Sequence, residues 1–165
     1  MIYYNDEDEL ISEHLNLVMG KNYVLKLQEI SGDIFEPIRV RLREASGRIR
    51  HRGADYLTFA IMDAIVDYYF LIIERIGEKI IDLEYKLYER KEDDTIIREI
   101  QLLKQELIKV RRAVFPIREV VSRFEKLGEN VVHPETQPYI RDLYDHTIQV
   151  IEAVDSFRDL SLIHI

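Results

Sequence analysis

The chain has 165 residues, enough for one domain with a hydrophobic core, and it contains no cysteine. Disulfides, thiolate metal sites and cysteine nucleophiles are therefore excluded. Its 31 acidic residues outnumber the 23 basic ones and give a net charge of −8, which argues against nucleic acid as the main partner because phosphate binding requires a basic face.

The first 30 residues predict a β-hairpin. Apolar and polar residues alternate on both sides of the turn sequence 20–22, as they do in half-buried strands. The alternating apolar residues are Leu15, Leu17, Met19, Tyr23, Leu25 and Leu27. Because a lone hairpin is marginally stable in water, we expect an unpaired edge and an uncovered apolar face that need further partners.

A short amphipathic helix is expected after the hairpin. Residues 31–33, Ser-Gly-Asp, have turn chemistry with a candidate helix cap, and the helix should run to about Ala45. Ser46 and Gly47 end it. The next residues, 48–52, are mostly basic and are interpreted as a linker.

Three long helices account for most of the remaining chain. They are predicted at residues 54–89, at residues 95–127, and from near Pro134 to at least Asp159, with a turn at 92–94 and a loop at 128–134. The first carries the apolar stripe Leu57, Ile61, Ile65, Tyr68, Ile72, Ile76, Ile80, Leu83 and Leu87. The second carries Ile97, Ile100, Leu103, Leu107, Val110, Val114, Ile117, Val121 and Phe124. Such heptad-like seams favour a long antiparallel helical hairpin, which Pro116 should kink.

Two aspartates interrupt the apolar run at residues 56–73. Asp63 and Asp67 are one helical turn apart, so they share a face of the first long helix. Carboxylates are rarely buried unless they are paired or bind a cation, and two of them argue against a membrane span. The pair therefore requires neutralisation by a cation or by basic side chains.

A second acidic cluster lies near the end of the chain, where Asp142 and Asp145 accompany His146. Asp142 and His146 are four residues apart, which is the spacing at which two ligands on one helix share an ion. Oxygen ligands suit Mg²⁺ or Ca²⁺, while an imidazole admits Co²⁺, Ni²⁺ or Zn²⁺. Together the two clusters suggest a divalent cation site. Neither cluster offers a closed set of ligands, so a site that uses Asp63, Asp67, Asp142 or His146 would need residues from both helices or from another subunit.

Less specific explanations remain open for both clusters. The first pair could form salt bridges with Arg48, Arg52 or Arg118, or could simply be exposed on a two-sided helix. The second cluster could be a solvated helix face that Arg141 screens. The chain contains no G-x-S-x-G, H-E-x-x-H, Walker or G-x-G-x-x-G motif, so an enzyme is not expected. A metal-dependent hydrolase would need all four ligands around one ion in a single chain.

A series of motifs follows along the chain. They are Asn22-Tyr23-Val24-Leu25, Gln28-Glu29, Gly32-Asp33 with Pro37-Ile38-Arg39, Ala54-Asp55-Tyr56-Leu57, Asp63-Ala64 with Val66-Asp67, Phe115-Pro116-Ile117-Arg118-Glu119-Val120, and Tyr139-Ile140-Arg141-Asp142-Leu143-Tyr144-Asp145-His146-Thr147. In order and spacing, from about Glu13 to Asp159, they resemble the cytoplasmic domain of CorA-type magnesium channels.

That resemblance implies a homopentameric, funnel-shaped channel for Mg²⁺ that also passes Co²⁺ or Ni²⁺. In the family, an α/β domain carries a long helical hairpin, and a stalk helix runs into the membrane. Mg²⁺ held between subunits keeps the funnel closed. Asp142 matches the stalk-helix aspartate of this regulatory site, while Asp63 and His146 match positions near a second ion site, with Asp67 one turn from Asp63.

The resemblance also divides the chain. Residues 1–50 correspond to the end of the α/β domain, 51–130 to the helical hairpin, and 131–159 to the start of the stalk helix. The expected fold is thus mainly α, a fragment of an α+β protein. The family's first half, including the sheet that carries the acidic partner of Asp142, has no counterpart here. The pore helices and the Gly-Met-Asn motif have none either, so we expect truncation at both ends. Residues 160–165 resemble a translated sequencing adapter and are interpreted as a non-native tail.

The resulting hypothesis is a fragment of the regulatory domain of a CorA-like channel. The intact parent would lie in the cell membrane, with this part on the cytoplasmic side and the fragment itself soluble. Its partners would be other copies of the same subunit. The alternative is a freestanding soluble helical module that oligomerises or binds a partner through its long hairpin.

Overall fold

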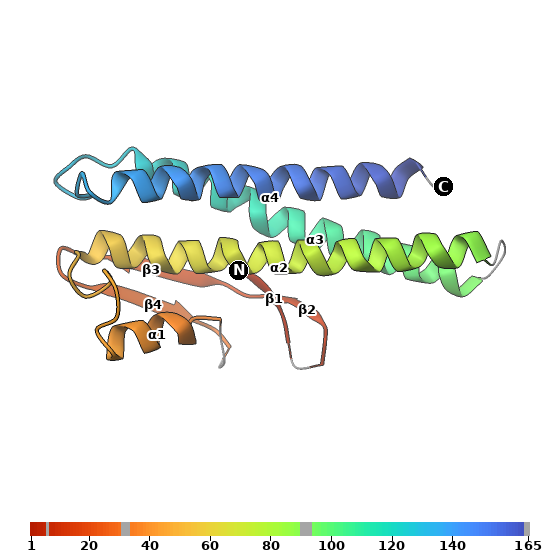
Figure 1. Cartoon of the computed structure of the whole chain (residues 1–165), viewed down its shortest axis with the longest axis horizontal. Coiled ribbons are helices and arrows are strands. Elements are labelled where there is room, and N and C mark those ends of the chain that lie inside the picture. Colours follow the sequence, from red (N-terminus) through yellow and green to blue (C-terminus); the bar gives the residue numbers. More distant parts are fainter. Residues whose placement is uncertain (6, 31–33, 90–93, 164–165) are drawn as a thin grey trace.

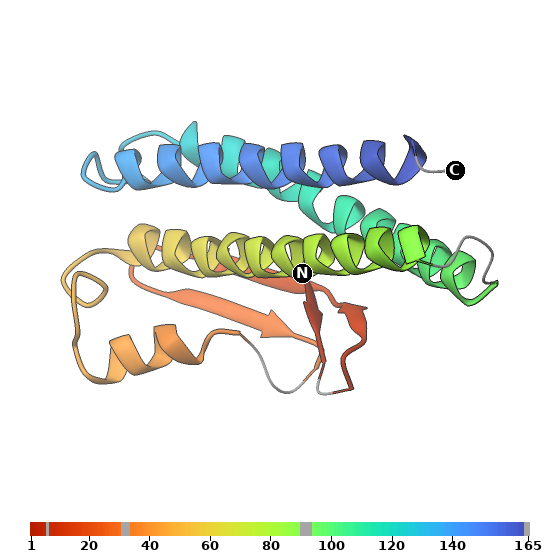
Figure 2. The same ribbon diagram turned by 45° about the vertical axis from the view of Figure 1, so that its right-hand side comes forward.

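The computed structural model describes residues 1–5, 7–30, 34–89 and 94–163 of the chain. Within them the elements, in chain order, are β1 (Ile2–Tyr4), β2 (Leu10–Ser12), β3 (Leu15–Met19), β4 (Val24–Gln28), α1 (Glu36–Arg43), α2 (Ala54–Glu89), α3 (Asp94–Glu125) and α4 (Gln137–Ile163). Figure 1 shows α4 along one side of α2, the strands and α1 on the other side, and α3 crossing obliquely. The same order of layers is visible in Figure 2. The mainly helical fold class is confirmed.

The core lies between the three long helices. The predicted apolar stripes supply part of it, including Ile72 and Ile76 from α2 and Val110 and Val114 from α3, all at most 1% exposed. Fully burying a side chain of this size contributes roughly 1.5–3 kcal/mol, so these contacts stabilise the packing of α2 against α3. One stripe position is wrong: Ile97 is 54% exposed, and its neighbour Ile96, at 3%, faces the core instead.

Helix α2 begins and ends at the predicted residues, while the other two long helices differ slightly. α3 ends at Glu125, two residues before the predicted end, and α4 begins at Gln137, three residues after Pro134. Pro116 lies inside α3, where its kink remains a prediction. Within the described residues, only α2 is long and apolar enough to cross a membrane, with a mean hydropathy of 1.6 over its most apolar window, yet 61% of that window is buried inside the fold.

The predicted hairpin forms from β3 and β4, with Leu15 opposite Gln28 and Met19 opposite Val24. Its inner face contacts α2. In β4, the register turns Val24, Lys26 and Gln28 to this inner face, and Leu25 and Leu27 point outward, where they are 48% and 52% exposed. The expected uncovered apolar face is therefore confirmed. The alternation of Leu25 and Leu27 with polar residues correctly predicted a strand, but it did not predict which face of that strand is buried.

A second hairpin, from β1 and β2, was not anticipated from the sequence. Its turn is acidic, and the Asn5 side-chain oxygen accepts hydrogen bonds from the backbone N–H groups of Glu7 and Glu9, at 3.1 and 2.8 Å. Tyr4 then donates a hydrogen bond to Glu106 of α3, at 3.2 Å. The short strands are thus held against the long helices by side chains rather than by a wider sheet.

The segment before α2 does more than link. Residues 31–33, which contain the predicted cap, lie outside the described residues. Helix α1 begins after an N-cap at Phe35. It ends before Ala45, whose φ of 54° is incompatible with a right-handed helix. Arg52 donates a hydrogen bond to the backbone carbonyl of Glu135, at 2.6 Å, and its guanidinium lies over the Tyr139 ring at 5.2 Å. The basic segment therefore joins the start of α2 to the start of α4.

Candidate metal centre

Asp63 and Asp67 project from one face of α2, as their spacing predicts. The described residues contain one group of three or more potential metal ligands, formed by this pair and His146 of α4. One ligand atom from each residue lies within 4.8 Å of the others. Asp63 is half-buried and Asp67 is exposed, so the group opens to solvent at one side.

The packing of α4 against α2 places His146 beside the two carboxylates. The Tyr139 ring lies 5.4 Å from Tyr56, edge to face, and 5.5 Å from Phe59, which holds the first turn of α4 on α2. Two turns later the His146 ring meets the edge of Phe70, at 6.2 Å. The His146 Nδ1 atom is buried and has no hydrogen-bond partner among the described residues.

Burial and the charge of Asp67 raise the pKa of Asp63 to about 6, while His146 and Arg41 oppose this effect. A carboxyl that titrates near neutrality binds a cation at the expense of a proton. The acidic pair therefore carries an electrostatic cost that a divalent cation would relieve.

The basic partners considered from the sequence do not neutralise this pair. Arg48 donates a hydrogen bond to the Tyr139 hydroxyl, and Arg52 contacts Glu135. Within the described part of the chain, Asp63 and Asp67 form no ion pair within 4.0 Å with Arg118 or with any other basic residue. The salt-bridge explanation is therefore wrong for these residues. The other explanation, simple exposure on the helix surface, holds for Asp67 but not for half-buried Asp63.

The structure separates Asp142 from the group. Asp142 is exposed on α4, one turn before His146, and it does not belong to the cluster of ligand atoms. Asp145 is exposed as well. Arg141, expected to screen these carboxylates, instead lies 3.8 Å from Glu125. The four predicted ligands therefore do not converge on one ion within this chain, which removes the geometry that a hydrolase would need.

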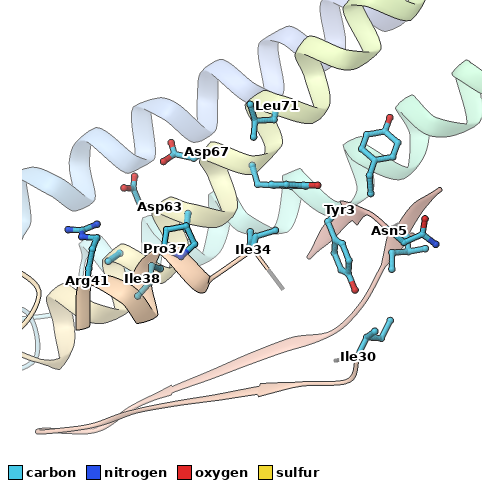
Figure 3. Close-up of a pocket in the computed structure, with 15 residues that line it drawn as sticks. Tyr3, Asn5, Ile30, Ile34, Pro37, Ile38, Arg41, Asp63, Asp67 and Leu71 are labelled. Carbon is cyan, nitrogen blue, oxygen red and sulfur yellow. The ribbon is translucent and has the colours of Figure 1, made fainter. Parts of the chain in front are cut away.

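A cavity of about 820 Å³ opens beside the acidic pair. It lies between α1, α2 and the β1–β2 hairpin, and most of its lining is apolar or aromatic (Figure 3). Asp63, Asp67 and Arg41 are the charged residues of this lining. Sequence reasoning missed Arg41, because nothing in a helix containing several arginines marks the one that faces an acidic pair.

The donor set suits a hard divalent cation. Two carboxylates supply the oxygen ligands that Mg²⁺ prefers, and the imidazole extends the range to Co²⁺ and Ni²⁺. The three ligand atoms all lie within 4.8 Å of one another, close enough to share one ion. The predicted ligands Asp63, Asp67 and His146 thus form a chemically reasonable group.

A family model described as "CorA-like Mg²⁺ transporter protein" matches residues 2–162. The cobalt/magnesium transport protein CorA of Thermotoga maritima is 43% identical over 158 residues, which cover 96% of this chain and 45% of that protein. The putative metal ion transporter YfjQ of Bacillus subtilis is 29% identical over 163 residues, which cover 98% of this chain and 50% of that protein. The chain spans about half the length of these curated relatives.

A solved structure has the same fold. It is the complete structure of the CorA magnesium transporter from Methanocaldococcus jannaschii, with a TM-score of 0.68 and 16% sequence identity. The match covers 96% of this chain and 57% of that one. The arrangement of hairpins and long helices is therefore shared despite the low sequence identity.

Proposed function

The chain belongs to the CorA-like Mg²⁺ transporter family, and we propose that it forms part of the cytoplasmic regulatory domain of a channel that carries Mg²⁺, and also Co²⁺ or Ni²⁺, across the cell membrane. The family consists of transporters, which agrees with the expectation that the chain is not an enzyme. In this proposal the chain senses the ion, and conduction belongs to membrane-spanning segments beyond it.

The observation that supports a sensing role is the meeting of Asp63 and Asp67 on α2 with His146 on α4. A cation held there would attach α4 to α2 by ligands from both helices. Without the cation, the two carboxylates repel each other and half-buried Asp63 is left with the cost of its charge. Cation binding would therefore favour the arrangement in which these two helices are packed together.

Asp142 is proposed to act between subunits rather than within one. It is exposed on α4 and forms no ion pair within 4.0 Å among the described residues, so its carboxylate is accessible to a neighbouring copy. In a homopentamer, Asp142 and an acidic group of the next subunit would repel each other until Mg²⁺ lies between them. Loss of the ion would then loosen the interface and open the channel.

Protease protection of the full-length protein tests this role. Replacing Asp142 with Ala or Lys should raise the Mg²⁺ concentration needed to protect the oligomer, because the intersubunit carboxylate is lost. Asp145→Ala, an exposed neighbour outside the ligand group, is the matched control and should behave like wild type. Protection of the Asp142 variants at the wild-type concentration would remove Asp142 from the mechanism.

Reading the coding DNA beyond Asp159, from material prepared without a transposase adapter, tests the channel itself. Two apolar helices separated by Gly-Met-Asn are expected downstream. A stop codon near Ile165 would instead favour the freestanding helical module that oligomerises or binds a partner.

A further inference from the structure

Helix α1 carries three arginines, and only two of them are neutralised within the helix. Arg39 and Arg43 each lie 2.9 Å from a carboxylate oxygen of Glu36. Arg41 forms no ion pair within 4.0 Å with any described carboxylate. Its charge is therefore available to groups outside α1.

The acidic pair is the group that Arg41 faces. Arg41, Asp63 and Asp67 line the same cavity, and Figure 3 shows the Arg41 side chain on the same side of the cavity as Asp63. The other residues that line the cavity are uncharged. Within the described lining, Arg41 is thus the single basic residue beside the pair.

We propose that Arg41 is the resident counter-cation of the Asp63–Asp67 pair and sets how tightly this pair holds a divalent cation. The inference rests on the proposed function of the pair as an ion site. Arg41 stabilises the empty, negatively charged pair and repels an incoming cation, so both effects weaken cation binding. By reciprocity, a bound cation weakens the attraction of Arg41 for the pair.

The test compares three variants of the chain by isothermal titration with Mg²⁺ and by the visible absorption of Co²⁺. Arg41→Gln should bind both ions roughly three- to tenfold more tightly than wild type, since a unit charge at this range acts through partly solvated surroundings. Raising the salt concentration should shrink this difference, because Arg41 is exposed. Arg43→Gln makes the same change in net charge on the same helix and should bind like wild type. Arg41→Lys keeps the charge and should remain close to wild type.

A titration without metal separates this inference from the proposed function. Followed by carboxyl ¹³C NMR, the pKa of Asp63 should be higher in Arg41→Gln than in wild type and unchanged in Arg43→Gln. If wild type binds the ions and Arg41→Gln binds them equally well, Arg41 is not the counter-cation although the site stands. Equal tightening in Arg41→Lys and Arg41→Gln would also overturn it, because the charge would not be the cause. If wild type binds neither ion, the ion site fails, and an unchanged Asp63 titration in Arg41→Gln would reject the counter-cation as well.

Discussion

The carboxylate of Asp55, in the first turn of α2, accepts a hydrogen bond from the backbone N–H of His133, at 2.9 Å, and lies 3.1 Å from the imidazole of the same residue. This contact joins the start of α2 to the loop that precedes α4, although 78 residues separate the two. Asp63 follows Asp55 by about two helical turns. The Asp55–His133 contact therefore helps to fix the register in which α2 presents its acidic pair to His146.

Asp55→Ala should destabilise the chain by about 1–3 kcal/mol, because the His133 N–H loses a buried acceptor. The Asp55 side chain is 1% exposed, and although burial acts the other way, the hydrogen bonds from His133 lower its pKa. Urea unfolding at neutral pH measures the change. Glu129→Ala removes an exposed acid from the same loop and should change stability by less than about 0.5 kcal/mol. Equal effects of the two substitutions would show that the contact contributes nothing.

Asp63 should make metal-free stability fall as the pH rises between about 4 and 6. Its pKa is raised from 3.8 to about 6, so the folded chain binds this proton more tightly than the unfolded chain does. Below this window, Asp63 is protonated in both the folded and the unfolded chain. Above it, Asp63 is ionised in both, and the folded chain bears the full cost of the buried charge. The stability difference between Asp63→Asn and wild type, from urea unfolding across this range, should therefore grow as the pH rises.

The matched control for that titration is Asp145→Asn, on the exposed face of α4. Over the same pH range, the change in the stability difference should be larger for Asp63→Asn than for this control. Because other carboxylates contribute slopes of their own, only the differences between variants are compared. A difference for Asp63→Asn that does not change between pH 4 and 6 would contradict the raised pKa.

Gly77 marks a close approach of α2 to α4. A Cβ atom added at Gly77 would lie 3.1 Å from the ring atom Cζ of Phe157. Alanine normally stabilises a helix interior over glycine by about 1 kcal/mol, so Gly77→Ala should give less than this while Phe157 is present. In a Phe157→Ala background the full gain should return. A double-mutant cycle from urea unfolding measures this coupling, and equal gains in both backgrounds would mean that the ring does not restrict position 77.

The uncovered face of the β3–β4 hairpin should promote self-association. Leu27→Lys places a charge on this exposed face, so it should reduce association on a sizing column and leave stability within about 0.5 kcal/mol. Leu17→Lys faces α2 from the inner side and should cost about 1–3 kcal/mol. If instead Leu27→Lys were the more destabilising of the two, the register of the hairpin would be wrong.

The long helices could be predicted from the sequence because their signals are local. Apolar residues spaced by three and four define α2 and α3, and Asp63 and Asp67 share a face through helical periodicity alone. The prediction of an ion site was also local, since two carboxylates in an apolar run need a cation or basic side chains nearby. The β1–β2 hairpin escaped prediction because its strands have three residues each and its acidic turn resembles a charged tail.

Tertiary structure decided which of these residues act together. Residues far apart in the chain meet only when α4 packs against α2, so local periodicity alone could not choose His146 over Asp142 as the third member of the group. The packing of the β3–β4 hairpin against α2 turns Leu25 and Leu27 to the outside. The alternation of a strand is the same on both faces, so only the neighbouring elements decide which face is buried. Arg41 faces the acidic pair for the same reason. The sequence by itself therefore determined the long helices, the β3–β4 hairpin and the residues with ligand chemistry, and the packing of these elements determined which residues meet.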